Sequence, residues 1–161
     1  MSNWDVNKYD IISVINYLTL LMLSALDEPI TQVSGLHVFL DLSGTTLQHV
    51  RCLTPRFLYL VAKGCRDTFP VRYKAFHLFN ASPAFHYIWA VLKFFLTAKF
   101  KKRVHFHDDL ESVGKFLPKE ILPTEYGGEN DDFDPAKLGE TEAEKFLPKY
   151  VEIIHNNYRI N

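Results

Sequence analysis

The chain has 161 residues, a formal net charge of −1 and a hydrophobic content of 47%. This length supports one domain with a sizeable core. The composition is typical of a globular protein and excludes a disordered chain. The net charge by itself says nothing about partners, and no nucleic-acid partner is expected.

Charge is distributed unevenly along the sequence. From Arg51 to Arg103 there are 11 Lys/Arg residues and one acid, Asp67, whereas the stretch from Lys119 to Lys145 holds nine acids and three lysines. A basic middle followed by an acidic end predicts one cationic face. Such a face is a candidate site for phosphate groups.

The first predicted element is a helix from Tyr9 to Leu26, ended by Asp27-Glu28-Pro29. Its apolar residues follow helical spacing. The most apolar part, Ile11–Leu23, has 13 residues and is interrupted by polar side chains. A membrane span needs about 20 apolar residues, and no basic region or small-residue cleavage site marks a signal peptide. The segment is therefore predicted to be a buried amphipathic helix.

A strand is predicted next, over Gly35–Gly44 (GLHVFLDLSG). Alternation places Leu36 and Leu40 on one face and His37 and Asp41 on the other. Both faces are mostly apolar, which is typical of a strand covered on both sides. The elements expected after it are, in order, a helix from Thr54 to about Asp67, a strand over 69–80, a helix from Ser82 to about Lys99, a strand over 102–108 and a short helix from Asp109 to about Phe116.

This alternation of strands and helices predicts an α/β fold with a mostly parallel sheet and right-handed crossovers. We expect a domain over residues 4–128, which ends in a Pro/Gly-punctuated extended segment. An acidic tail, 129–161, is expected to follow, with a possible short helix from Thr141 to Tyr158 that Pro148 breaks or kinks.

The sequence shows no catalytic or nucleotide-binding motif. His105 and His107 share a strand face and could bind a metal, but no third ligand has comparable spacing. Asp41 at a strand end could be catalytic, but nothing near it in sequence supplies a nucleophile. We therefore predict a binding protein, with no catalytic residues, no metal and no cofactor.

The two cysteines, Cys52 and Cys65, are expected in one helix and about 20 Å apart along it. This separation is far beyond the reach of a disulfide. We expect both thiols to be reduced, as in a cytosolic protein.

The helix from Ser82 to Lys99 is the strongest local signal. Its apolar residues extend beyond one stripe, as in a helix that is fully buried or that meets something apolar besides the protein core. Four cations in five residues end it (Lys99, Lys101, Lys102 and Arg103). Cations also suit a solvated helix end, so both interpretations remain open at this point.

Four segments, in this order, resemble the CRAL-TRIO lipid-binding domain family. They are GLHVFLDLSG, FPVRYKAFHLFNAS, VLKFFLTAKFKKRVHFHD and LPKEILPTEYGG. The chain looks similar to the branch of the α-tocopherol transfer protein and the cellular retinaldehyde-binding protein, in an insect-like form. The resemblance covers roughly Trp4 to Gly128.

The resemblance implies a non-enzymatic carrier that holds one small hydrophobic ligand, such as a retinoid, tocopherol or carotenoid. The ligand would lie between the sheet and a mobile gate helix, matched here by Asn80–Arg103. The residues expected in the pocket are Ile15, Leu18, Met22, Leu36, Leu40, Phe69, Phe76, Leu78, Phe85, Ile88 and Leu92. By similarity, the membrane-facing positions of the gate are Phe85, Ile88 and Val91, and the phosphoinositide-binding positions are Arg72, Lys74, Lys99 and Arg103.

The resemblance also implies that an N-terminal helical module and the first strand of the lipid domain are missing. We expect an uncovered sheet edge and apolar surface to favour self-association. The expected location is the cytoplasm, with transient contact with phosphoinositide-bearing membranes. The alternative is a regulatory or adaptor module that binds phosphoinositide or protein through its basic patch without transferring a ligand.

Overall fold

The computed structural model describes residues 4–68, 70–132, 134, 140–141, 144–145 and 147–148. Phe69 and most of the C-terminal helix predicted over 141–158 lie outside these described residues. The elements are α1 (Ile11–Asp27), α2 (Pro29–Ser34), β1 (Leu36–Asp41), α3 (Leu47–Cys52), α4 (Pro55–Lys63), the π-helical turn η1 (Gly64–Thr68), β2 (Tyr73–Phe79), α5 (Pro83–Phe95), α6 (Ala98–Lys101), β3 (Val104–His107), α7 (Leu110–Gly114) and the 3-10 turn η2 (Thr124–Tyr126).

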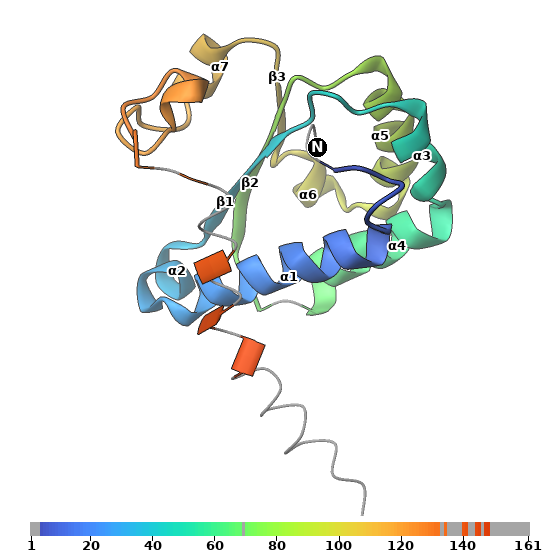
Figure 1. The fold of residues 1–161 in the computed structure, drawn as a ribbon, viewed down its shortest axis with the longest axis horizontal. Coiled ribbons are helices and arrows are strands. Elements are labelled where there is room, and N and C mark those ends of the chain that lie inside the picture. Colours follow the sequence, from blue (N-terminus) through green and yellow to red (C-terminus); the bar gives the residue numbers. More distant parts are fainter. Residues whose placement is uncertain are drawn as a thin grey trace, which may run out of the picture.

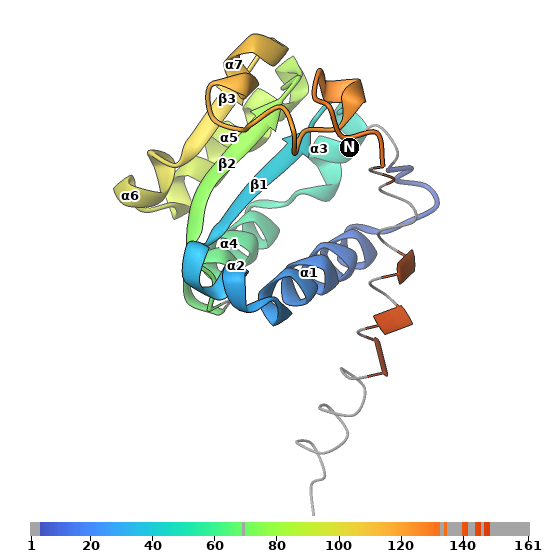
Figure 2. The ribbon, with the colours of Figure 1, turned by 90° about the vertical axis from the view of Figure 1, so that its left-hand side faces the viewer.

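Within the described residues, the three strands form one parallel sheet in the order β1-β2-β3. This arrangement confirms the predicted α/β class. Figure 1 shows α3, α4, α5 and α6 on one side of the sheet and α7 on the other. After a quarter turn, α1 runs below the sheet and beside α4 (Figure 2).

The first face of the sheet carries the larger apolar core. Leu78 of β2 packs there with Leu58 of α4 and with Phe85 and Ile88 of α5, and Leu42 completes this buried group. Half-buried apolar side chains from α3, α5 and the strands surround it. Leu40 of β1 packs against this group, as its alternation predicted. Leu36 is half-buried and stands beside an irregularity in the pairing of β1 with β2.

The second face is covered by residues 110–130, which we call the cover. Phe79 of β2 lies here in a smaller buried cluster with Val113, Leu117 and Leu122 of the cover. The cover is also bonded to itself, because the N–H of Glu129 donates to the carbonyl of Lys119 at 2.8 Å. The two faces of the sheet therefore differ in both size and make-up of their cores.

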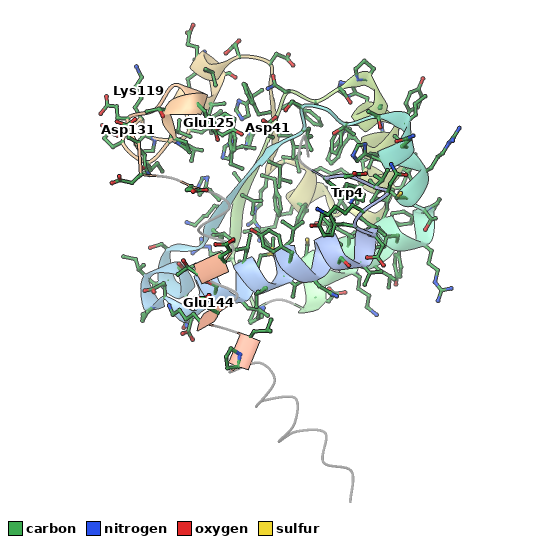
Figure 3. The ribbon with its side chains drawn as sticks, in the orientation of Figure 1. Trp4, Asp41, Lys119, Glu125, Asp131 and Glu144 are labelled. Atoms are coloured by element: carbon green, nitrogen blue, oxygen red, sulfur yellow. The ribbon has the colours of Figure 1, made fainter. Side chains whose placement is uncertain are left out.

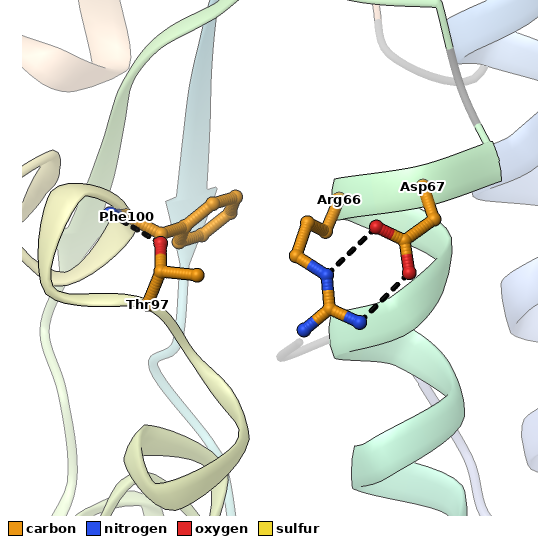
Figure 4. Close-up of polar contacts among 4 residues, drawn as sticks. All are labelled: Arg66, Asp67, Thr97 and Phe100. Carbon is orange, nitrogen blue, oxygen red and sulfur yellow. Dashed lines mark hydrogen bonds and ion pairs between the residues drawn. The ribbon is translucent and has the colours of Figure 1, made fainter.

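The helix predicted from Ser82 to Lys99 is two helices. Leu96 has an extended backbone (φ −95°, ψ 141°), and α6 begins again after Thr97. The Oγ1 atom of Thr97 accepts the N–H of Phe100 at 3.2 Å (Figure 4). This hydrogen bond caps a new helix, because threonine offers the backbone an alternative to continuing the old one. The lysines therefore lie on a separate short helix.

The structure differs from the prediction in two further respects. Short helices α2 and α3 had not been predicted, because each has only six residues and too few turns to show a period. Cys52 ends α3 and Cys65 lies in η1, so the two thiols are not in one helix. Both are free, and burial raises the pKa of the Cys65 thiol.

The N-terminal segment is tied to the domain by side-chain contacts. The ring of Trp4, labelled in Figure 3, makes an edge contact with His49 of α3 at 4.9 Å between centroids. Its Nε1–H donates to the carbonyl of Tyr9 at 2.8 Å. Asp10 then caps α1 by accepting the N–H of Ser13 at 2.7 Å. This cap sets the start of α1 two residues later than the sequence predicted.

Candidate functional site

Part of the predicted pocket set comes together on the first face of the sheet. Leu78, Phe85 and Ile88 belong to the buried core there, and Leu40 and Leu92 pack against it. They come from β1, β2 and α5, three elements that the parallel topology places side by side. The sequence thus identified a real apolar cluster, although the cluster by itself is equally a structural core.

A second group joins α1 to the start of β2. The Tyr73 hydroxyl lies 3.3 Å from the Sδ atom of Met22. The Tyr73 ring packs on Phe76 at 5.0 Å, and Phe76 packs on Phe100 of α6 at 5.0 Å between centroids. Two predicted pocket residues, Met22 and Phe76, therefore share one aromatic neighbour.

Helix α1 is apolar but poorly covered. None of its 17 residues is buried within the described part of the chain. Ile15 and Leu18 are half-buried, as is Leu36 on β1. A helix this apolar normally gains its stability by burying a face. Apolar surface of α1 and of β1 is therefore left partly open to water.

Helix α5 directs its predicted membrane-facing residues inward. Phe85 is 7% exposed and Ile88 is 4% exposed, whereas Val91 is half-buried. The outward side chains are instead Tyr87, at 67% exposed, and Phe94, at 79%. Contact between the first two residues and a membrane would require α5 to leave the sheet.

The four predicted phosphoinositide-binding residues lie around the amino ends of the strands. The carbonyl of Arg72 accepts the N–H of Leu36, and the carbonyl of Arg103 accepts the N–H of Phe76 at 2.7 Å. These bonds place the two arginines at neighbouring strand starts. No ion pair with an acid holds Arg72, Lys74, Lys99 or Arg103 among the residues that the structure describes.

Backbone packing explains how Lys74 comes to lie beside Arg72. A Cβ atom on Gly35 would stand 2.5 Å from the Arg72 carbonyl oxygen and 3.2 Å from two carbons of the Lys74 side chain. Gly35 also has φ +83°, a region that favours glycine. The stem of Lys74 therefore runs over Gly35, which lets its charged end reach solvent.

Asp41 is bound to the cover instead of serving as a free acid. Its carboxylate accepts the Ser43 N–H at 2.9 Å and the Tyr126 hydroxyl at 3.1 Å. Burial works against ionisation of Asp41, but these hydrogen bonds outweigh it and lower its pKa. Burial raises the pKa of Tyr126 to about 12, and the nearby carboxylate adds to this rise. Figure 3 labels Asp41 at the end of β1, near Glu125 of η2.

Four histidines line the second face of the sheet. His105 and His107 share a face of β3, as predicted, and the parallel register brings His77 of β2 beside them. His37 of β1 stacks on the other side of His77 at 5.5 Å between centroids. Sequence reasoning missed this row because it considered each strand alone. Aligning the even-spaced histidines of parallel strands would have found it.

Within the described residues, no three His, Cys, Asp or Glu side chains are placed so that they could hold a metal ion together, the histidine row included. His107 uses both ring nitrogens on protein partners, His77 at 3.0 Å and Ser112 at 2.9 Å. Its ring is therefore occupied by hydrogen bonds.

No helix in the described part of the chain has the length and apolarity needed to cross a membrane.

Comparison with known proteins gives a consistent family. The sequence model of the CRAL/TRIO domain family matches residues 1–128 of this chain. Clavesin-2 of Mus musculus is 31% identical over 134 residues, which cover 83% of this chain and 41% of the relative. Clavesin-1 of Xenopus laevis is 25% identical over 160 residues, covering 99% and 48% of the two chains. The chain thus spans less than half the length of these curated relatives. The crystal structure of Sfh5 aligns with 71% of this chain and 43% of its own, at a TM-score of 0.46 and 15% identity.

Proposed function

The chain belongs to the CRAL/TRIO domain family, a family of lipid-binding domains, and from this premise we propose that it binds one small hydrophobic ligand and transfers it between membranes. The ligand class is a retinoid, tocopherol, carotenoid or similar molecule. The ligand lies between α1, the first face of the sheet and α5. Release takes place at phosphoinositide-bearing membranes that the protein touches transiently from the cytoplasm.

The observation that carries the proposal is the incomplete burial of α1. A 17-residue apolar helix without one buried residue runs below the sheet (Figure 2), and Leu36 and Leu40 of β1 are also half-buried. At about 25 cal/mol per Å² of apolar surface removed from water, an elongated hydrophobic molecule here gains several kcal/mol. The apolar lining offers few polar groups, which suits a ligand with little polarity.

Bound ligand is the decisive readout for this function. The chain is purified from cells, extracted with organic solvent and analysed by mass spectrometry, beside a matched extract of an unrelated protein. We expect one hydrophobic species at a ratio near one per folded chain. An empty extract from a folded chain contradicts the carrier function and favours the adaptor alternative.

The four cations at the strand starts are proposed to bind phosphoinositide head groups. Arginine and lysine suit phosphate, and arginine can bind it with two parallel hydrogen bonds. Each cation near an anionic membrane contributes about 1 kcal/mol. Replacing Arg72, Lys74, Lys99 and Arg103 by Gln should therefore weaken binding to vesicles containing phosphatidylinositol bisphosphate at least about tenfold.

A control variant that loses the same number of charges distinguishes a specific head-group site from general electrostatic attraction to the membrane. Four exposed cations on α3, α4 and α5 lie elsewhere, and their replacement by Gln removes the same charge (Arg51, Arg56, Lys63 and Lys93). Vesicle sedimentation at several salt concentrations compares the two variants. Equal losses in both variants would show that no site exists at the strand starts.

We further propose that the uncovered edge of the sheet supports self-association. Within the described residues, β1 ends the sheet on one side and has no strand beyond it. Unpaired edge strands are templates for pairing with another chain. Size-exclusion chromatography with light scattering over a hundredfold concentration range should show a dimer or larger species. A monomer at every concentration contradicts this proposal.

A further inference from the structure

The histidines of the second face form a continuous hydrogen-bonded ladder. The Nδ1 atom of His37 lies 3.2 Å from Nε2 of His77. The Nδ1 atom of His77 lies 3.0 Å from Nε2 of His107. The Nδ1 atom of His107 then reaches the hydroxyl of Ser112 in α7 at 2.9 Å. The ladder thus crosses the whole sheet and ends in the cover.

Ser112 fixes the direction of every bond in the ladder. Its hydroxyl lies 2.8 Å from the carbonyl of Asp109, which can only accept, so the single hydroxyl hydrogen goes there. Ser112 must then accept a hydrogen from Nδ1 of His107. A neutral imidazole has one donor and one acceptor, so Nε2 of His107 accepts from Nδ1 of His77. The same reasoning makes His37 the donor to His77.

This arrangement holds only while the inner rings are neutral. A second proton on His107 would sit on Nε2, facing the N–H of His77. A second proton on His77 would face the N–H of His37 in the same way. The opposed donors are avoided only when every ring between the added proton and His37 moves its own hydrogen to Nε2, and the positive charge then stays on a ring that the cover keeps from water. His37, which is exposed, stands at the solvent end of the ladder.

The surroundings offer the inner rings little compensation for positive charge. His77 is fully buried, stacks on His105 at 5.5 Å and packs against the apolar ring of Phe116 at 5.3 Å. Burial and the neighbouring imidazoles lower the pKa of His77 to about 4.

The charged groups around the ladder act on its far end or elsewhere. Burial and then His105 lower the pKa of His107, against the opposing effect of the carboxylates of Asp109 and Asp108. On α7, Glu111 and Lys115 approach each other at 3.9 Å on the exposed side. Asp41 of β1 binds Ser43 and Tyr126 of the cover.

We propose that the histidine row acts as an acid-sensitive latch: the cover, which rests on it through Phe116 and the His107–Ser112 bond, stays closed while His77 and His107 are neutral and opens to let water reach these rings when they gain protons. Release uncovers Phe79 and Phe39, which the cover packs against. The buried histidine on the other side of the sheet, His49 of α3, bonds to Thr46 and to the carbonyl of Trp4 and is not part of the ladder, so we expect the helices there to stay in place. The latch is a property of the sheet's second face and is independent of the ligand proposed for the first.

Amide hydrogen exchange read by mass spectrometry tests the latch on the whole chain. If the pKa of His77 rises from about 4 in the closed cover to about 6.5 in the open one, linkage predicts about a twentyfold gain in opening from pH 7 to pH 5. Peptides from 110–130 should show this gain after correction for intrinsic exchange rates. Peptides from α5 should show little change. An equal change in both regions, or none in the cover, overturns the proposal.

A variant and a control isolate the ladder. His77→Asn keeps a side-chain N–H for His107 but cannot titrate, so we expect the acid response of the cover to fall to less than about threefold. His86→Gln removes a histidine that stacks on Phe106 of the first face, and its acid response should match that of the parent chain. An unchanged acid response in a folded His77→Asn chain overturns the latch.

A second measurement keeps the test independent of that variant's folding. Nitrogen-15 NMR of the parent chain reports which ring nitrogen carries the proton. The ladder requires the Nδ1–H form for His77 and His107 at pH 7. In contrast, His49 accepts the Thr46 N–H at Nδ1 and must carry its proton on Nε2, which supplies an internal reference. Nε2–H forms for the two ladder rings overturn the proposal.

Discussion

The two faces of one small sheet are built on different physical principles. The first face is apolar, and its buried core of Leu78, Phe85 and Ile88 depends on shape and contact alone. The second combines a small apolar cluster with a row of hydrogen-bonded histidines and the Asp41–Tyr126 bond. The first can exchange one apolar neighbour for another, whereas the second depends on donors and acceptors that must match.

This difference separates two kinds of opening. Contacts in the first face are non-directional, so the ligand proposed for this face would need no fixed polar partners. Hydrogen bonds in the second face have fixed partners, and the loss of one partner leaves a buried polar group unpaired. The proposed ligand site relies on the first property, and the proposed latch relies on the second.

The largest effect is expected from emptying the core of the first face. Phe85→Ala should lower the free energy of unfolding by about 3–5 kcal/mol, because it removes a buried aromatic side chain and leaves a cavity. Urea unfolding measures this loss. Phe94→Ala on the exposed side of α5 is the control, with an expected change within about 0.5 kcal/mol. Similar losses in both variants would show that α5 does not bury Phe85 and expose Phe94 as the structure describes.

A smaller effect is expected in the cover. A Cβ atom on Gly128 would collide with the backbone of Leu122, whereas one on Gly114 would meet nothing within 4 Å. Gly128→Ala should therefore cost about 1–3 kcal/mol, as overpacking does, and raise exchange in 110–130 before it affects α5. Gly114→Ala should be neutral in the same assay. A tolerated Gly128→Ala contradicts the close approach of these two segments.

The smallest effect is expected at the link between β1 and the cover. Tyr126→Phe removes the hydroxyl that donates to Asp41, at a cost of about 1 kcal/mol. The pKa of Asp41 should rise, since that hydrogen bond lowers it. The ionised Asp41 carboxylate contributes stability above its unfolded pKa, and this contribution is lost as the pH falls through its lowered folded pKa. Acidification should therefore lower the free energy of unfolding less in Tyr126→Phe than in the parent chain.

Titration of the Asp41 carboxyl carbon by NMR measures the effect of Tyr126→Phe. Tyr87→Phe is the matched control, because it removes a hydroxyl from an exposed ring on α5. We expect no shift of the Asp41 titration in the control. An unchanged Asp41 pKa in Tyr126→Phe would show that the Tyr126 hydroxyl does not stabilise the ionised carboxylate of Asp41.

Much of the first face could be predicted from the sequence. Leu40 and Leu78 alternate with polar or aromatic neighbours on their strands, and Phe85, Ile88 and Leu92 repeat at helical spacing. These local periods carry the information, because one face of each element must meet the core. Spacing alone did not decide between the two roles expected of Phe85 and Ile88, which were the lining of a pocket and contact with a membrane. A helix apolar around most of its girth does not show which side meets the sheet.

The break between α5 and α6 also escaped sequence reasoning. Leu96 and Thr97 interrupt no hydrophobic period, and threonine occurs both inside helices and at their starts. The break lies where the backbone of Leu96 is extended and Thr97 caps α6.

The sequence by itself determined the family, the parallel α/β class and the apolar character of the elements around the first face, because motifs and periods are local properties of the chain. Only the tertiary structure decided which histidines meet. His37, His77 and His107 are separated by 30 to 40 residues, and they become neighbours through the register of three parallel strands. Register is a relation between strands, set by the packing of whole faces, so no single segment carries it.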